Sequence, residues 1–231
     1  MKKISMLDAW LERTDPLHSF IDLESRPPNR ELGGFLALDV VVPAHESLNL
    51  EAESLTTSWH AVHGYVDHAL SIIDADHPLW LDSEEADMIR EQLGSPPPLC
   101  YPLYLISVGD GADERLVYVG KTSSSKGRFK GGHAAFSKLL APKFDGQPKR
   151  VYLAAVVLLS DDVSYQPLEW VKPIDTAELL LRSIEAQLIH FFKPELNTQH
   201  VHKFNAKWPV SLHIQNFTGE TSFLNNKYCW P

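Results

Sequence analysis

Two stretches rich in strand-forming residues decide the fold: Tyr101-Pro-Leu-Tyr-Leu-Ile-Ser-Val108 and Leu116-Val-Tyr-Val-Gly-Lys-Thr122. Aromatic and β-branched side chains favour strands, and the polar, glycine-containing segment between the two stretches is typical of a hairpin connection. Side chains alternate between the two faces of a strand. The hairpin can therefore bring Tyr104 and Tyr118 to one surface.

The residues that follow the hairpin predict the rest of a small α+β domain. An apolar stripe at helical spacing indicates a helix starting near His133, and nearly every side chain of Val151–Leu159 is apolar, which predicts a buried third strand. Asp175 and Glu178 have the spacing of a capping box, which opens a long helix that ends before Pro194. We therefore expect a small three-stranded antiparallel sheet flanked by helices.

The chain before the hairpin is predicted to be a mixed α/β extension. One strand is expected over Gly33–Pro43, and helices are expected over Ile4–Arg13, Ser58–Ile73 and Ser83–Leu93. The proline-rich stretch Gly94–Pro98 cannot continue a helix and makes a stiff connector. The expected domains are an acidic region over 1–98, a central domain over 99–200 and a tail over 201–231, whose aromatic residues predict packing on the core.

The charge of the chain is unevenly distributed. Over 231 residues the formal net charge is −9, but residues 1–98 hold 6 Lys and Arg against 18 Asp and Glu, whereas residues 115–150 hold 9 against the single Asp145. A phosphate backbone responds to such a local basic patch whatever the total charge, although a solvated surface with no partner is the alternative.

The composition is that of a globular protein, with 44% hydrophobic and 22% charged residues. No apolar run approaches the roughly 20 residues of a membrane helix, and the first residues lack the apolar core of a secretory signal. We therefore expect no membrane partner and a cytoplasmic location.

The cysteines and most histidines favour structural roles. Cys100 and Cys229 are far apart and form no Cys-x-x-Cys pair, so reduced thiols are expected. His60 and His63 share a helical face but lack the acidic companions of a zinc motif, and His200-Val-His202 is interpreted in the same way.

Glu185 is the least ordinary carboxylate of the chain. It belongs to the long helix before Pro194, and three of its four neighbours one turn away are apolar, namely Leu181, Leu188 and Ile189. Burying an unpaired carboxylate is costly, so Glu185 needs a cation, a metal ion or a strong hydrogen-bond donor.

The order of these residues resembles the GIY-YIG nuclease superfamily. The two name-giving triplets of that family align with Pro102-Leu103-Tyr104 and Tyr118-Val119-Gly120, and its helical arginine matches Arg128. Its closing pattern is matched by Glu185-Ala-Gln-Leu-Ile-His-Phe-Phe-Lys-Pro-Glu-Leu-Asn197. The chain departs from the family at Pro102, which replaces the first glycine at a strand start, where proline is also tolerated.

The resemblance implies a GIY-YIG-like fold and a metal-dependent endonuclease that hydrolyses phosphodiester bonds in DNA. Tyr104 would be the general base, supported by Tyr118, and Glu185 would hold one Mg²⁺, for which Mn²⁺ can substitute. The implied catalytic set is Tyr104, Tyr118, Lys121, Arg128 and His133, and the implied phosphate contacts are Lys121, Lys126, Arg128, Lys130 and Asn197.

These residue types suit that chemistry. A tyrosine, with a reference pKa of about 10, becomes a base only where cations such as Lys121 and Arg128 stabilise its phenolate. Arginine presents a fixed fork of donors that matches phosphate oxygens, and Mg²⁺ needs few protein ligands because it keeps most of its waters.

The sequence is also compatible with other functions. Pro102 and the net acidity favour a catalytically inactive module of the same fold that binds nucleic acid or a protein partner. An enzyme acting on nucleotides or other small molecules is a weaker alternative, because the chain has no glycine-rich phosphate loop. A second copy of the chain is a further candidate partner.

Overall fold

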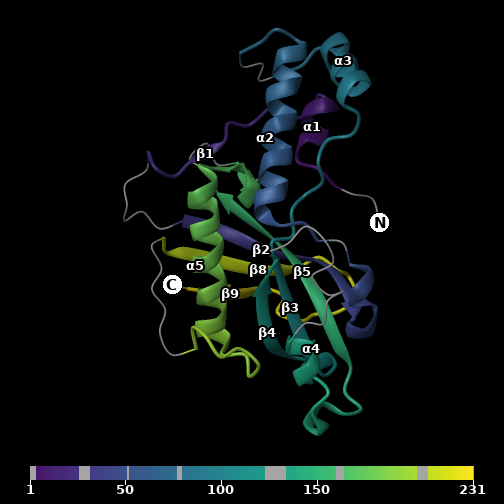
Figure 1. Cartoon of the computed structure of the whole chain (residues 1–231), viewed down its shortest axis with the longest axis vertical. Helices are drawn as coiled ribbons and strands as arrows, with labels where there is room; N and C mark the ends of the chain where they lie inside the picture. The colour runs from purple at the N-terminus through teal and green to yellow at the C-terminus, as the bar shows by residue number, and fades with distance from the viewer. Residues whose placement is uncertain are drawn as a thin grey trace.

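The computed structural model describes residues 4–25, 32–50, 52–76, 80–122, 134–159, 164–201 and 208–230. Its centre is a curled, mixed seven-stranded sheet (Figure 1) in the order β4-β3-β5-β2-β8-β9, with β6 paired to β5 outside this path. The strands are β2 (Leu32–Pro43), β3 (Leu103–Val108), β4 (Arg115–Lys121), β5 (Lys149–Leu159), β6 (Tyr165–Pro167), β8 (Val210–Asn216) and β9 (Lys227–Cys229). A separate parallel pair joins β1 (Ile21–Asp22) to β7 (Val171–Lys172).

The α+β class is retained, but the prediction of a small three-stranded antiparallel sheet is wrong. The expected strands do lie together as the antiparallel neighbours β4, β3 and β5. The sheet then continues beyond these three strands, because the second edge of β5 pairs antiparallel with β2. The strand β5 is also long, with 11 residues against the 6 of β3. An uncovered apolar edge of that length would leave a row of backbone groups without partners.

The sheet draws strands from all parts of the chain. The strand β2 comes from the acidic region 1–98 and lies at the centre, where it pairs antiparallel with β5 and parallel with β8. The region 201–231 adds β8 and the edge strand β9. The sheet therefore crosses the expected boundaries at residues 98 and 200, and whether each region folds independently stays a prediction.

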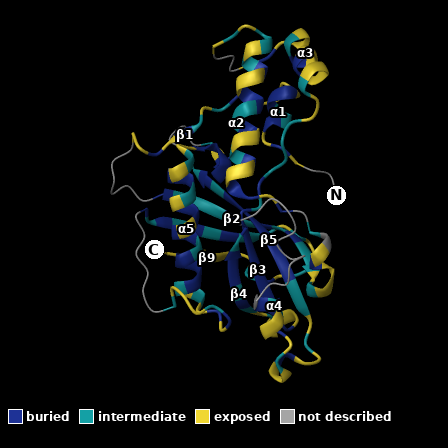
Figure 2. Ribbon diagram, viewed as in Figure 1, coloured by how far each residue is buried: buried dark blue, intermediate teal, exposed yellow. Residues whose placement is uncertain are grey.

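Five α-helices surround this sheet in the described ranges: α1 (Leu7–Leu11), α2 (Leu55–Ile72), α3 (Ser83–Leu93), α4 (Ala134–Lys138) and α5 (Ile174–Phe192). The helices α1, α2 and α3 stand together at one end of the molecule (Figure 1) around a hydrophobic cluster of their own that includes Trp10, Val62 and Ile89. Figure 2 shows that the sheet is largely buried, whereas α2 and α3 expose one side.

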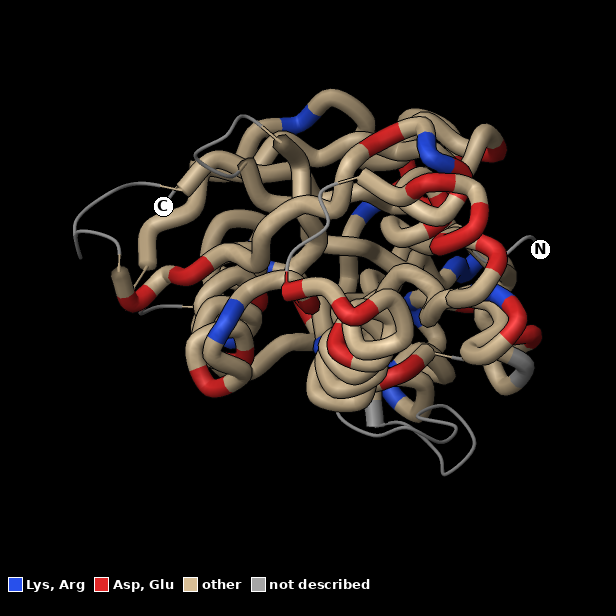
Figure 3. Tube along the Cα trace, turned by 90° about the horizontal axis from the view of Figure 1, so that it is seen from above, with Lys and Arg blue, Asp and Glu red and all other residues tan. Residues whose placement is uncertain are grey.

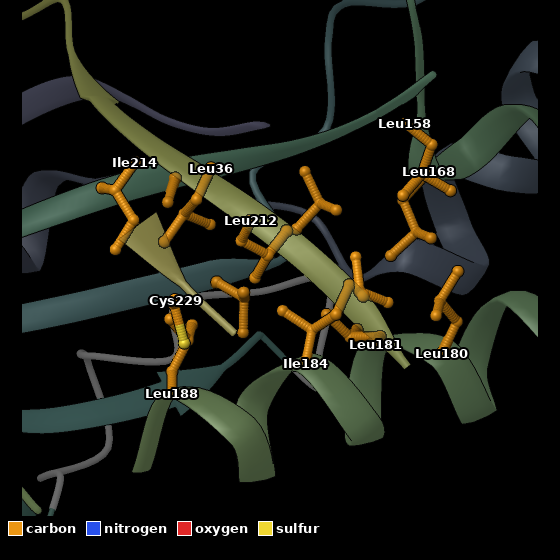
Figure 4. Packing of buried hydrophobic residues seen from close by; sticks show 14 of the residues in the cluster. Leu36, Leu158, Leu168, Leu180, Leu181, Ile184, Leu188, Leu212, Ile214 and Cys229 are labelled. Carbon is orange, nitrogen blue, oxygen red and sulfur yellow. The ribbon is translucent and has the colours of Figure 1, made fainter. Parts of the chain in front are cut away.

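The helix α5 covers one face of the sheet and forms the first core (Figure 4). Leu181, Ile184 and Leu188 of α5 belong to one buried cluster with Leu36 of β2 and Leu212 of β8. Apolar burial of this kind is worth about 25 cal/mol per Å² of area removed from water. This packing fixes α5, and with it Glu185, against the sheet.

A β-bulge lets β2 contribute to both faces of the sheet. The pairing of β2 with β5 shifts between Leu38 and Val40. Leu38 points into the first core, whereas Val40 packs on the opposite face in a second core with Tyr104 and Leu153. An inserted residue reverses which face the following side chains occupy, and Asp39 is the inserted residue here.

The expected capping box at Asp175 is wrong. The N-cap of α5 is Pro173, with no side-chain cap bond, and the backbone N–H of Thr176 donates to the Pro173 carbonyl oxygen at 3.1 Å. Asp175 therefore lies in the first turn, where a negative charge still interacts well with the helix dipole. The end of α5 is as predicted, since Lys193 adopts the left-handed conformation immediately before Pro194. Both cysteines are buried free thiols, as expected.

Candidate active site

The hairpin β3–β4 brings the two motif tyrosines together, as alternation predicted. Tyr104 pairs with Gly120 and Ile106 pairs with Tyr118 across the hairpin. The two tyrosine rings are stacked, with centroids 5.9 Å apart and an angle of 28° between their planes. Tyr104 is completely buried in the second core, whereas Tyr118 is half-buried.

The glycine of the Tyr-Val-Gly triplet makes this stacking possible. A Cβ atom at Gly120 would lie 2.4 Å from Oη and 2.5 Å from Cζ of Tyr104, and 2.8 Å from Cε1 of Tyr118. These distances are far below ordinary contact between carbon atoms. Only a residue without a side chain lets the Tyr104 ring lie across β4 at this point.

Pro102 is compatible with the strand, as expected. It directly precedes β3, and its carbonyl oxygen accepts a hydrogen bond from the backbone N–H of Thr122 at 2.8 Å. The proline therefore takes part in the pairing of the hairpin through its acceptor. A proline at the start of a strand costs little, because the ladder does not require its missing N–H.

Asn197 closes the outer edge of β4. Its Nδ2 donates to the Val119 carbonyl oxygen at 2.8 Å, and its Oδ1 accepts from the Val119 N–H at 2.9 Å. The backbone N–H of Leu196 donates to the Val117 carbonyl oxygen at 3.0 Å. The amide of Asn197 thus binds backbone at both of its ends, and its expected phosphate contact stays a prediction.

A pocket of about 210 Å³ lies beside β4, between α4, α5 and the turn that follows α5. Tyr118, Glu185 and Asn197 all border it, so three of the expected site residues meet there although they are far apart in the sequence. The lining consists of Tyr118, Ala135, Lys138, Glu185, Ile189, Leu196, Asn197, Thr198, Gln199 and His200. Tyr104 and Lys121 do not belong to this lining.

Two functional groups of the pocket were missed by sequence reasoning. Lys138 comes from α4, and its Nζ donates to the Leu196 carbonyl oxygen at 3.1 Å. His200 follows α5 with a φ of 63°, in the left-handed region that residues other than glycine seldom adopt. Lys138 was counted only as part of the basic segment, and His200 was set aside because it lacks a metal-binding motif.

Tyr101, which packs against the second core, and Tyr152, which belongs to the first, are poorly suited to act as a base. Tyr101 donates a hydrogen bond to the Asp39 carboxylate, and Tyr152 donates one to the Glu114 carboxylate at 2.7 Å. Burial first, and then the adjacent carboxylate, raises the pKa of both phenols well above the ordinary value.

Two cations of the basic segment 115–150 lie beside carboxylates from other parts of the chain. Lys121 lies 4.0 Å from the Glu178 carboxylate, and Glu178 also accepts a hydrogen bond from Thr56 of α2 at 2.9 Å. Arg150 pairs with Asp110 at 2.8 Å. Acidic and basic positions are interspersed along the described chain (Figure 3), and a net charge counted over residues 115–150 leaves out Glu178 and Asp110, the acidic partners of Lys121 and Arg150.

The other expected site residues, Lys126, Arg128, Lys130 and His133, lie outside the described residues. The described ranges contain no group of three or more His, Cys, Asp or Glu side chains that could hold a metal ion. Among the described lining residues Glu185 is the one carboxylate, and the volume of the pocket leaves room for several waters of about 30 Å³ each. One carboxylate with waters suits Mg²⁺, so this donor set fits the expected ion.

Comparisons with models of protein families, with curated proteins and with solved structures found no match for this chain. Within the described ranges, no helix combines the length and the apolar character that crossing a membrane requires.

Proposed function

We propose that the pocket beside β4 is the active site of a metal-dependent endonuclease of the GIY-YIG type, which hydrolyses phosphodiester bonds in DNA. One observation carries the proposal: Tyr118 and Glu185, which motif order alone selected, border the same pocket together with the cation Lys138. A phenol, a carboxylate and a cation are the groups that this hydrolysis needs around one phosphate.

The two tyrosines exchange the roles expected from the motif. Tyr118 borders the pocket, whereas Tyr104 is completely buried and its ring stacks against the Tyr118 ring. A general base must come within hydrogen-bond reach of the water that it deprotonates. Tyr118 is accordingly the phenol that takes the proton, and Tyr104 holds the Tyr118 ring in place.

The carboxylate of Glu185 would hold one Mg²⁺ or Mn²⁺. When bound, this ion supplies charge neutralisation at the phosphoryl oxygens and at the leaving oxygen. The ammonium group of Lys138 adds a fixed positive charge on the α4 side of the pocket. Arg128, which lies outside the described residues, retains its proposed role as the clamp of the scissile phosphate.

A catalytically inactive binding module is the second candidate. The complete burial of Tyr104 favours it, as does the ion pair that occupies Lys121, because both reduce the groups available for chemistry. Such a module would bind DNA or a protein partner with no requirement for a metal ion.

Cleavage of an end-labelled DNA duplex separates the two candidates. The nuclease cuts with Mg²⁺ or Mn²⁺ and stops in EDTA, whereas the binding module shifts the duplex in a gel in EDTA and yields no product with either metal. A protein that neither binds nor cuts DNA contradicts both.

The tyrosine roles are tested in the same assay with two matched variants. Tyr118→Phe removes the hydroxyl that borders the pocket and should lower the cleavage rate by about 10²-fold or more, the usual contribution of a general base. Tyr104→Phe keeps the buried ring and should retain most of the activity. The opposite order of the two rates would restore Tyr104 as the base.

A further inference from the structure

The turn after α5 collects three cations from three different elements. Lys138 of α4 donates to the Leu196 carbonyl oxygen at 3.1 Å. Lys143, from the 3₁₀ turn Pro142–Phe144, donates to the Glu195 carboxylate, and Nε of Arg115 lies 4.0 Å from the same carboxylate. We name Arg115, Lys138 and Lys143 the turn cation cluster.

Gln147 orders two members of this cluster. Its Oε1 accepts a hydrogen bond from Arg115 at 3.1 Å, and its Nε2 donates to the Lys143 carbonyl oxygen at 2.7 Å. The Lys143 ammonium also lies over the Phe144 ring, 4.7 Å from its centroid. Gln147 and Glu195 thus orient the Arg115 guanidinium, and Glu195 and the Phe144 ring orient the Lys143 ammonium, which lowers the entropic cost of binding a partner.

The cluster is open to an outside partner. The Arg115 and Lys143 side chains are 48% and 56% exposed, and Glu195 is 37% exposed. An exposed ion pair contributes only about 0 to 1 kcal/mol, so another anion can replace the carboxylate at little cost. Arg115 and Lys143 share the Glu195 carboxylate and Lys138 binds a backbone carbonyl oxygen, which leaves local positive charge on a chain of net charge −9.

The cluster lies next to the candidate active site. Lys138 and Leu196 themselves line the pocket, and Glu195 directly precedes Leu196. A strand of DNA whose scissile phosphate enters the pocket carries its neighbouring phosphates a few ångströms away, because phosphates are closely spaced along the backbone.

We infer that the turn cation cluster binds the phosphate backbone of DNA beside the scissile phosphate, with Glu195 occupying the phosphate position in the free protein. The inference rests on the proposed function for its partner, since it needs DNA at this pocket. It assigns the flanking contacts to Arg115 and Lys143, outside the motif residues. Glu195 then acts as a competitor that incoming DNA displaces.

The test measures binding of the full chain to a short DNA duplex in EDTA over a series of salt concentrations. Each phosphate contact that is lost should reduce the slope of log K against log salt concentration by about 0.9. The double variant Arg115→Gln/Lys143→Gln should therefore bind more weakly, with a slope smaller by about 2. Glu195→Gln should bind more tightly than wild type, because it removes the competitor.

The matched control is Lys227→Gln. Lys227 is exposed and lies on β9, at the opposite edge of the sheet from β4. The Lys227→Gln variant loses one positive charge outside the turn cation cluster. Its affinity for DNA and its slope of log K against log salt concentration should therefore stay close to those of wild type. Thermal unfolding of every variant checks that the fold is retained.

Each result decides between the two proposals. A wild-type slope for the double variant together with a wild-type affinity for Glu195→Gln, in a protein that still binds and cuts DNA, overturns this inference and leaves the nuclease proposal in place. Absence of any DNA binding by wild type overturns both. Binding through the cluster without cleavage supports this inference and favours the binding module over the nuclease.

Discussion

Gly120→Ala tests the stacked tyrosines on which the candidate site depends. The added Cβ would lie 2.4 Å from Tyr104 Oη and 2.5 Å from Cζ. Neither ring can swing freely away, because Tyr104 is completely buried and Tyr118 stacks against it. The φ of Gly120 is outside the left-handed region, so the substitution acts through packing and not through backbone strain.

The expected cost follows from the displacement. To restore ordinary carbon contacts of about 3.5 Å or more, the Tyr104 ring must move by about 1 Å inside a closed core. Such overpacking costs about 1 to 3 kcal/mol in the free energy of unfolding. The measurement is urea unfolding at neutral pH, and a midpoint shift with an unchanged m-value identifies a loss of stability.

Two controls make this prediction sharp. Gly64→Ala, in the middle of α2, has no heavy atom within 4 Å of its new Cβ and should stabilise the protein by up to about 1 kcal/mol. In a Tyr104→Ala background, Gly120→Ala should cost much less than it costs in wild type. Equal costs in the two backgrounds, or a Gly120→Ala protein as stable as wild type, would refute the account.

One further variant probes the edge of the site, and another probes Glu169, a buried carboxyl in the 3₁₀ turn Leu168–Trp170. Asn197→Ala removes both hydrogen bonds to Val119 and should lower the free energy of unfolding by about 1 to 3 kcal/mol, with faster hydrogen exchange at the Val119 amide; unchanged exchange there would contradict the edge contact. Burial raises the pKa of the Glu169 carboxyl from 4.5 to about 7, so the folded state prefers the protonated form. Wild-type stability should therefore fall, relative to Glu169→Gln, by about 3 kcal/mol as the pH rises from 4.5 through 7. If the difference in the free energy of unfolding between wild type and Glu169→Gln stays constant over that pH range, Glu169 is not the origin of the pH dependence.

Local pattern predicted the elements of this fold well. The helix expected over Ser83–Leu93 has those bounds, and the strand expected over Gly33–Pro43 begins one residue earlier, at Leu32. Alternation also predicted that Tyr104 and Tyr118 meet. These features depend on residues close together in the sequence, where hydrophobic period and turn chemistry act directly.

Long-range partners could not be predicted in the same way. The pairing of β2 with β5 and β8 joins distant segments, and no local signal distinguishes a strand that extends a sheet from one that forms its own. The ion pairs have the same origin, since Glu178 and Glu195 reach Lys121 and Lys143 only after folding. A count of charges along one segment includes none of these partners.

The residues that line the pocket also divide into those that the sequence predicted and those that only the folded chain brings together. Motif order selected Tyr118, Glu185 and Asn197, which all line it. Lys138 and His200 carry no motif, and they enter the lining because α4 and the turn after α5 fold against β4. The backbone contacts of Asn197 were also unpredictable, because they depend on its position beside Val119, which arises only in the folded chain.

The central claim is tested most directly by the rate at which supercoiled plasmid is nicked in Mg²⁺ by wild type and by Glu185→Ala. The matched control is Glu91→Ala, which removes an exposed carboxylate on α3. We expect nicking by wild type and Glu91→Ala that EDTA abolishes, and no nicking by a folded Glu185→Ala protein. Nicking by Glu185→Ala at the wild-type rate would contradict the assignment of the pocket as the active site.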